Sequence, residues 1–277
     1  MQTEEHFTDH IGDERAKNYF TSEEAAQRYA QGRPAAHSRV LPSLLRALAD
    51  ALPVARALDV ACGTGNSTQA LLPYARSIVG LDSSREMLAQ TSPHSAIAYR
   101  KGYAEALPFG AGEFDLVTVS SAYHWFDHDR FLGEAARVLR PGGWLALYKI
   151  GSMGRLEGDH EFEFWRREVF RARFPKVARN DERLDAERAA QFGFAEVTAE
   201  SATHRQSYTL ESYVENLLSH SSVIRVVDEQ NEPVDVTRRW LREELARFFP
   251  KGGAEFSHEA QIHILKSNPS ATLRVSG

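Results

Sequence analysis

The segment "LDVACGTGNST", residues 58–68, decides the fold of this 277-residue chain. An apolar run that ends at Ala61 meets a turn containing Gly63 and Gly65, and a helix start follows. Glycine permits positive φ and lets the backbone come close to a ligand, and the free N–H groups at a helix start favour an anionic group. The segment therefore predicts a strand, a ligand-binding turn and a helix, with the acidic Asp59 just before the turn.

Short apolar runs alternate with helical patterns from residue 57 to residue 150. The predicted strands are 57–61, 77–81, 96–101, 114–120 and 144–150. The predicted helices between them are 67–74, 84–90 and 130–139. This alternation is typical of an α/β fold with a Rossmann-like, doubly wound and mostly parallel sheet, helices on both faces, and ligands beyond the carboxyl ends of the strands.

The pattern changes after Gly151. The elements predicted there are helices at 161–174 and 184–191, a strand at 194–201, helices at 210–220 and 236–249, and a terminal antiparallel strand at 260–267. Residues 207–257 interrupt the last strand pair, and ordinary connections are far shorter. We expect a helical lid insertion there, with a purely structural excursion as the alternative.

The chain is therefore divided into three parts. They are an N-terminal helical cap (1–56), a core (57–206 and 258–277) and the helical lid insertion (207–257).

Composition excludes several classes of function. The net charge is −5 and the basic residues are scattered, so we expect no nucleic-acid partner. The single cysteine, Cys62, excludes an internal disulfide and a multi-cysteine zinc site, and we expect no metal. The first twenty residues are charged and no apolar run reaches ~18 residues, so we expect a cytoplasmic protein without a membrane partner. A monomer and a homodimer both remain open.

The glycine turn and the next strand narrow the ligand. The dinucleotide fingerprint requires a third Gly or Ala where Thr68 stands, which disfavours a pyrophosphate. Asp82 closes the second strand, where a carboxylate can accept both hydroxyls of a ribose; the alternative, compatible role is the N-cap of the next helix. A ribose without pyrophosphate, beside a turn suited to a small charged tail, suggests a nucleoside that carries an amino acid.

Five segments together resemble the ordered motifs of class I S-adenosylmethionine-dependent methyltransferases. They are "LDVACGTGNST", "VGLDSSREML", "AEALPF", "FDLVTVSSAYHWF" and "EAARVLRPGGWLALY", which fall within residues 57–150. The combination of "YAQGRP" (29–34) with "AYHWFD" (122–127) resembles the small-molecule branch that includes trans-aconitate methyltransferase-like enzymes. The resemblance implies methyl transfer from S-adenosylmethionine, with S-adenosylhomocysteine as product, to a small-molecule acceptor.

The resemblance also implies a set of cofactor-binding residues. They are Tyr29, Arg33, Asp59, Ala61, Gly63, Gly65, Asp82, Ser83, Met87, Ala104, Glu105 and Ser120. Asp59 and the backbone of 61–65 would hold the amino and carboxylate groups of the cofactor's methionine, and Arg33 could pair with that carboxylate, unless it is a surface arginine.

The other implied roles follow the order of the motifs. Asp82 would bind the ribose, with Ser83 and Met87 beside the adenine. The N–H of Ala104 would meet an adenine nitrogen, Glu105 would anchor that loop, and Ser120 would lie near the sulfonium end.

Two positions depart from the family pattern. Ala61 stands where the family often has glycine, and its methyl group is tolerated if φ is negative. Tyr103 stands where many relatives carry an aspartate that accepts from the adenine amino group, so tyrosine would stack on the adenine or point away.

The acceptor side is less defined by the sequence. His124 is a candidate general base, a substrate or cofactor contact, or a cap for the helix that begins near 127–129. The residues Tyr213, Asn216, Leu217 and His220 recur at helical spacing and either line the acceptor pocket or pack. Cys62 is assigned to packing. The methylated atom is open: carboxylate, hydroxyl, amine or carbon.

Two other functions compete with this interpretation. One is a non-catalytic partner subunit that binds S-adenosylmethionine. The other is a NAD(P)-dependent oxidoreductase on the same fold, against which Thr68 and the "AEALPF" segment argue.

Overall fold

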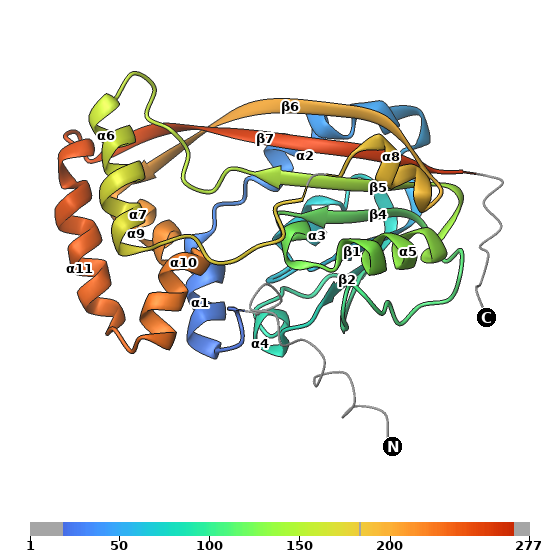
Figure 1. Cartoon of the computed structure of the whole chain (residues 1–277), viewed down its shortest axis with the longest axis horizontal. Helices are drawn as coiled ribbons and strands as arrows, with labels where there is room; N and C mark the ends of the chain where they lie inside the picture. The colour runs from blue at the N-terminus through green and yellow to red at the C-terminus, as the bar shows by residue number, and fades with distance from the viewer. Residues whose placement is uncertain (1–18, 183, 269–277) are drawn as a thin grey trace, which may run out of the picture.

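A computed structural model describes residues 19–182 and 184–268 (Figure 1). Its centre is a seven-stranded sheet with the strand order β3-β2-β1-β4-β5-β7-β6. The strands are β1 (Val54–Val60), β2 (Ala75–Asp82), β3 (Ile97–Lys101), β4 (Phe114–Ser120), β5 (Leu139–Ile150), β6 (Phe194–Thr209) and β7 (Gly253–Ser267). Strands β1 to β5 are parallel, and β7 is antiparallel to both of its neighbours. The predicted fold class is confirmed.

Alternation along the strands builds two apolar layers, because successive side chains point to opposite faces of a sheet. On one face, Leu58 and Val60 pack with helix α5 (His128–Val138). On the other face, Ala57 packs with helices α2 (His37–Leu44) and η2 (Arg46–Ala51). Leu71, which follows helix α3 (Asn66–Ala70), belongs to the same apolar layer. The sheet is therefore covered on both sides, as a doubly wound fold requires.

Polar caps set where several helices begin, because a side-chain oxygen satisfies an N–H group that the first turn leaves free. Asp127 accepts from the N–H of Arg130 at the start of α5, at 3.1 Å. Asp185 does the same for helix α8 (Ala186–Gln191), and Ser84 for helix α4 (Arg85–Leu88). The predicted cap role of Asp82 is therefore wrong: the residue two positions later takes it.

The β6–β7 hairpin is longer than predicted. Its pairs run from Phe194 opposite Ser267 to Thr209 opposite Gly253, so the residues that connect the two strands are 210–252, which lie within the predicted insertion of 207–257. The outer half of β6 alternates exposed with partly buried polar residues. It carries no apolar period, and the sequence pattern therefore ended the strand too early.

A third apolar core, at one end of the molecule, is formed by helices that precede β6 in the chain and by helices between β6 and β7 (Figure 1). They are α6 (His160–Phe164), the π-turn η4 (Trp165–Val169), α7 (Phe170–Arg173), α9 (Leu210–Leu218), α10 (Ser221–Ile224), η5 (Arg225–Glu229), α11 (Val234–Leu245) and η6 (Ala246–Phe248). Phe162, Trp165 and Phe170 pack there against side chains of the insertion. The predicted core of 57–206 thus contains a helical segment, α6 to α7, whose packing belongs to the insertion. We call the whole group the helical layer.

The N-terminal helix α1 (Glu23–Gly32) joins the helical layer rather than the sheet. A Cβ atom on Gly32 would lie 2.2 Å from the carbonyl oxygen of Glu215 in α9, so glycine alone permits this backbone approach. Arg28 forms an ion pair with Asp228 at 2.6 Å.

Residues 1–18 of the predicted cap and 269–277 of the predicted core lie outside the described residues. No helix among those described is long and apolar enough to cross a bilayer.

Candidate active site

A cavity of about 340 Å³ opens at the carboxyl ends of the parallel strands. Its walls come from the sheet edge on one side and from α1, α9 and the outer part of the β6–β7 hairpin on the other. Most of the predicted site residues line it: Tyr29, Arg33, Ala61, Gly63, Asp82, Ser83, Met87, Ala104, Glu105, Ser120 and His124. Asp59 and Gly65 do not line it. The described lining carboxylates, Asp82 and Glu105, mark what we call the acidic end; Lys149 and Arg179 mark the basic end.

The turn after β1 alternates left-handed residues with others. Ala61, Gly63 and Gly65 have φ of 55°, 56° and 84°. The condition set for Ala61, a negative φ, is not met: the methyl group sits in a conformation that L-residues adopt at a cost of ~1–2 kcal/mol. A turn with alternating backbone handedness forms a concave, N–H-lined surface suited to an anionic group.

Glycine is required at position 65 because of the packing behind it, and Gly65 does not line the cavity. A Cβ atom there would lie 2.4 Å from the hydroxyl oxygen of Tyr99 on β3. The ring of Tyr99 also lies beside Gly80 of β2. Burial raises the pKa of Tyr99 to about 12. The two glycines therefore make room for the partly buried Tyr99 ring to pack behind the turn.

Asp59 lies under the turn and faces away from the cavity. It is fully buried and accepts hydrogen bonds from the hydroxyls of Ser67 (2.6 Å), Thr68 (2.7 Å) and Thr118 (2.8 Å). Burial raises the pKa of its carboxyl, and the three hydroxyl donors oppose that shift. Thr68 stands where the dinucleotide fingerprint has its third glycine. Its hydroxyl donates to Asp59, which a glycine could not do. Of these residues, Ser67 also lines the cavity.

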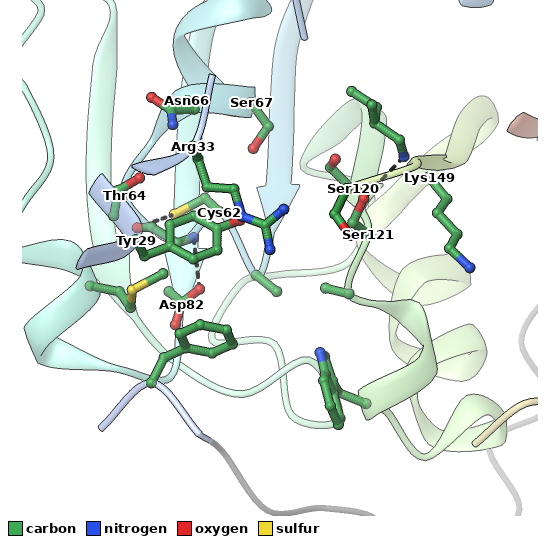
Figure 2. A pocket seen from close by; sticks show the side chains of 18 of the residues that line it. Tyr29, Arg33, Cys62, Thr64, Asn66, Ser67, Asp82, Ser120, Ser121 and Lys149 are labelled. Atoms are coloured by element: carbon green, nitrogen blue, oxygen red, sulfur yellow. Dashed lines mark hydrogen bonds between the residues drawn. The ribbon is translucent and has the colours of Figure 1, made fainter. Parts of the chain in front are cut away.

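Asp82 connects two loops at the acidic end (Figure 2). Its carboxylate accepts the N–H of Gly63 at 2.8 Å on one oxygen and the N–H of Ser84 at 2.9 Å on the other. Burial raises its pKa, and the backbone N–H groups of Ser84, Gly63 and Ser83 lower it. An ionised carboxylate has about four acceptor sites, so acceptor capacity remains for a ligand hydroxyl.

The loop after β3 supplies the far wall of the acidic end. Ala104 and Glu105 line the cavity there, and Glu105 accepts the N–H of Asp127 at 3.0 Å. Tyr103 lines it too, with 40% of its surface exposed. Cys62 is buried beside the turn, and burial raises the pKa of its thiol well above the usual range, as suits a packed side chain.

Helix α1 brings Tyr29 and Arg33 over the cavity (Figure 2). The Arg33 guanidinium lies 5.0 Å from the centre of the Tyr29 ring and donates to the Ser219 carbonyl at 3.5 Å. Its Nε is buried without a hydrogen-bond partner among the described residues. The side chain is therefore no simple surface arginine, and it retains a donor for a ligand.

His124 lines the cavity near the basic-end cations Arg179 and Lys149. Burial and the neighbouring charges of Arg179 and Lys149 lower its pKa to about 3. It does not cap the next helix, because Asp127 does so. Its ring lies 4.6 Å from that of Trp125, another lining residue. A neutral imidazole with so low a pKa is a poor general base near pH 7.

The insertion residues divide between the two predicted roles. Tyr213 and Leu217 are fully buried in the helical layer, and only Asn216 of the four lines the cavity. Asn216 donates to the Ser152 carbonyl at 2.9 Å. His220 is buried nearby, and burial lowers its pKa.

The basic end contains residues that the sequence interpretation missed. They are His37, Ser121, Lys149, Arg179, His204, Tyr208, Ser221 and His258. Lys149 ends the strand beside β4, so the rule that pointed to Ser120 would have found it. His204 and His258 are paired across β6 and β7, whose true length the sequence did not reveal. Arg179 lies in a loop without any pattern.

Comparisons with known proteins agree with this fold. The profile of the methyltransferase domain family matches residues 58–147. The trans-aconitate 2-methyltransferase of Deinococcus radiodurans is 38% identical over 109 residues, which cover 37% of this chain and 41% of that protein. The chain spans less than half the length of the curated relatives it matches.

Two solved structures share the fold. A candidate type II methyltransferase from Anaeromyxobacter dehalogenans has a TM-score of 0.61 at 20% identity, covering 85% of this chain and 96% of that one. A Haemonchus contortus phosphoethanolamine N-methyltransferase, solved with phosphomonomethylethanolamine and S-adenosylhomocysteine, has a TM-score of 0.54 at 16% identity, covering 93% and 61%. Residues 58–147 of this chain thus match a methyltransferase domain, and the fold around them is shared with solved methyltransferase structures.

Proposed function

We propose that the protein transfers a methyl group from S-adenosylmethionine to a small-molecule acceptor. The observation that carries the proposal is the acidic end of the cavity, where a left-handed backbone turn faces a carboxylate with acceptor sites to spare. When bound, S-adenosylmethionine supplies a methyl group that is already activated by a positively charged sulfur. Alignment of the two reactants then provides much of the acceleration.

The described residues fit this cofactor. Asp82 would accept the ribose hydroxyls, and Met87 and Ser83 would lie beside the adenine, with the N–H of Ala104 facing a ring nitrogen. The turn at 61–65 and Arg33, whose Nε lacks a partner among the described residues, would hold the methionine carboxylate. Gly65 would serve by admitting Tyr99, and Ser120 would lie near the sulfonium.

Asp59 would act through its neighbours rather than by direct contact. Its carboxylate fixes the hydroxyls of Ser67 and Thr68 at the start of α3. That arrangement would hold the helix start, with its free N–H groups, against the ligand. Asp59 is thus a positioning residue in this proposal.

The helical layer would serve as the lid. We propose that the described part of the predicted N-terminal cap (19–56) and the insertion predicted at 207–257 cover the acceptor, because α1 and α9 both line the cavity and pack against each other. Such a cover limits access of water to the reacting groups. A cavity of about 340 Å³ favours a small acceptor over a macromolecular one.

Calorimetric titration of S-adenosylhomocysteine tests the proposal. Asp82→Asn removes the charge that would bind the ribose, and a hydrogen bond to a charged group contributes ~1.5–3 kcal/mol, so binding should weaken roughly 10- to 150-fold. Asp115→Asn is the matched control. Asp115 is equally buried and accepts the N–H of Arg56 at 2.7 Å, but it does not line the cavity.

The control variant should lose stability while keeping its affinity for S-adenosylhomocysteine. A wild-type protein that binds neither S-adenosylmethionine nor its product at millimolar concentration contradicts the proposal. Binding without turnover over a broad metabolite panel would favour the partner-subunit alternative.

A further inference from the structure

An open hollow on the helical layer is lined by four cations. Arg166, Arg167 and Arg171 reach it from the helix that runs from η4 into α7, and Lys176 follows shortly after α7. Pro175 is the other described residue of its wall, so no described carboxylate lines it. We call it the α7 hollow. It shares no lining residue with the cavity.

The π-turn η4 gathers these cations on one face. The N–H of Phe170 donates to the carbonyl of Trp165, which is five residues earlier rather than four. Such a wide turn brings side chains five positions apart, here those of Arg166 and Arg171, toward the same face of the helix. π-turns are rare within helices and occur frequently at functional sites. The local backbone therefore places like charges close together.

The charge of the two outer arginines is only partly neutralised. Arg166 and Arg167 both bind the carboxylate of Glu163, at 2.6 Å and 2.5 Å. One negative charge thus serves two guanidinium groups. Glu168 lies on the same turn, but it does not line the hollow and forms no ion pair with a described residue.

Arg171 carries an uncompensated charge in a partly buried position. Neither Arg171 nor Lys176 forms an ion pair with a described carboxylate. Burial and the charge of Arg166 lower the pKa of Arg171, so its charged form is held at a cost. Arg225 adds a further guanidinium at the wall: it donates to the Pro175 carbonyl at 3.4 Å, and its Nε is buried without a partner among the described residues.

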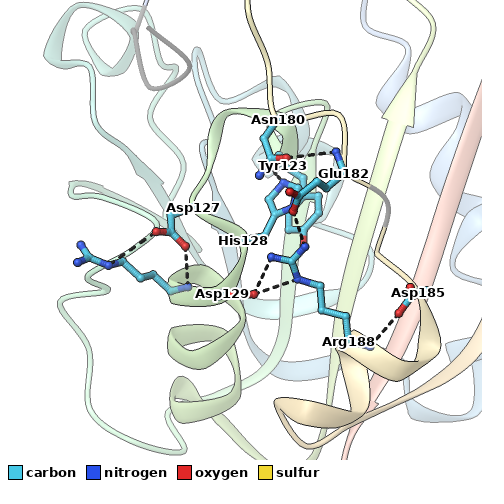
Figure 3. A network of polar contacts seen from close by, with 9 residues as sticks. Tyr123, Asp127, His128, Asp129, Asn180, Glu182, Asp185 and Arg188 are labelled. Atoms are coloured by element: carbon cyan, nitrogen blue, oxygen red, sulfur yellow. Dashed lines mark hydrogen bonds and ion pairs between the residues drawn. The ribbon is translucent and has the colours of Figure 1, made fainter. Parts of the chain in front are cut away.

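Another group of charges shows how the same chain neutralises an arginine elsewhere (Figure 3). Arg188 of α8 binds Glu182 at 2.6 Å and Asp129 of α5 at 2.7 Å, so two carboxylates surround one guanidinium. The ratio at the α7 hollow is the reverse, with one carboxylate for two guanidinium groups. The hollow therefore lacks the counter-charge that the folded chain supplies to Arg188.

We propose that the α7 hollow is an anion-binding site, separate from the cavity, in which Arg171 and Lys176 bind the phosphate group of a ligand. A carboxylate offers one charge and two oxygens. A phosphate monoester carries nearly two charges and three strong acceptor oxygens, which several cations can share. Soluble phosphate esters and phospholipid headgroups both present this group. The inference goes beyond the proposed function and does not depend on it, because no residue of the cavity takes part.

Calorimetric titration at fixed ionic strength tests the inference. The probes are pyrophosphate and a tricarboxylate of similar charge. We expect pyrophosphate to bind at millimolar concentration or below and the tricarboxylate to bind more weakly. Arg171→Gln and Lys176→Gln each remove a charged donor and should weaken pyrophosphate roughly 10-fold or more. Lys176 is exposed, so its variant keeps the test valid even if replacement of the partly buried Arg171 disturbs folding.

Two further variants control for net charge and for the cavity. Arg130→Gln removes an exposed arginine of α5, which lies away from α7 in the fold (Figure 1) and lines neither the hollow nor the cavity. Arg179→Gln removes a cation of the cavity itself. The affinity for pyrophosphate should stay within a few-fold of wild type in both variants.

Sedimentation with phosphatidylcholine vesicles, with and without phosphatidate, separates the two sources of phosphate. Binding of pyrophosphate assigns the site to a soluble ligand. Preference for phosphatidate vesicles that Arg171→Gln abolishes, without binding of pyrophosphate, assigns it to a headgroup. The inference is overturned if the protein shows neither, if the tricarboxylate binds as tightly as pyrophosphate, or if Arg130→Gln or Arg179→Gln weakens binding as much as Arg171→Gln and Lys176→Gln do.

Discussion

The two ends of the cavity are built in different ways. The acidic end comes from consecutive strand ends and turns within residues 61–105, and its two lining carboxylates, Asp82 and Glu105, each accept backbone N–H groups. The basic end gathers side chains from α2, β5, the loop at Arg179, α10 and the β6–β7 hairpin. A site for a ligand that related proteins share can rest on local backbone geometry. A site for a ligand that differs between relatives is assembled from exchangeable side chains of distant segments.

Gly65→Ala should have the largest effect, and it should fall on the acidic end. The left-handed φ costs ~1–2 kcal/mol and the clash with Tyr99 a further ~1–3 kcal/mol. Gly142→Ala is the control, because Gly142 has a φ of 76° but no atom within 4 Å of the added Cβ. Urea denaturation should show a loss about twice as large for Gly65. Equal losses would mean that the Tyr99 contact does not matter.

Acidification should destabilise the protein through the basic end. The folded-state pKa of about 4 for His37 and about 3 for His124 lies below the unfolded value. The unfolded state therefore binds more protons below about pH 6.5, and stability falls as pH decreases, by roughly 2 kcal/mol for each histidine at pH 5. Asp59 and Asp82 have raised pKa values and act in the opposite sense.

Denaturation between about pH 7 and pH 5 measures this slope. Replacing His37 or His124 by glutamine should flatten it, whereas Asp82→Asn should not. A slope that both histidine variants leave unchanged would show that other groups govern the acid response.

The smallest expected effect compares two strained residues, one near each end. Ala61 and Ser121 have φ of 55° and 54°. Ala61→Gly should stabilise by ~0.5–1 kcal/mol, since relief of strain exceeds the entropy gained by the unfolded chain. Ser121→Gly should not stabilise, because the Ser121 hydroxyl accepts the N–H of Ile150 at 3.2 Å. Melting temperatures measure both; a gain in both variants would mean that this hydrogen bond contributes little.

The sequence predicted the sheet and the acidic end well because their signals are local. Asp82 and the glycine turn could be placed from strand ends alone, since parallel strands meet at one edge. Asp59 shows the limit of that rule. It follows Leu58 and precedes Val60, so strand alternation turns its side chain to the opposite face, under α3, and away from the cavity.

The basic end was mostly beyond prediction for a physical reason. Arg179 is placed by hydrogen bonds of neighbouring residues to His124 and α5, contacts that join distant parts of the chain. His204 and His258 depend on hairpin register in a polar strand, where no hydrophobic period fixes it. Such positions follow from tertiary structure and leave no mark in local composition.

The contact between Gly32 and Glu215 limits which segments of this protein can be exchanged with those of a relative. The backbones of α1 and α9 meet so closely that no other residue fits at Gly32 without displacing one of them. Segments nearly two hundred residues apart in the gene therefore share one fitted joint. A chimera that received the insertion of a relative without that relative's N-terminal helix would lose this close fit between α1 and α9. A change of acceptor specificity therefore requires replacement of both segments together, or substitution of single side chains within the existing backbone.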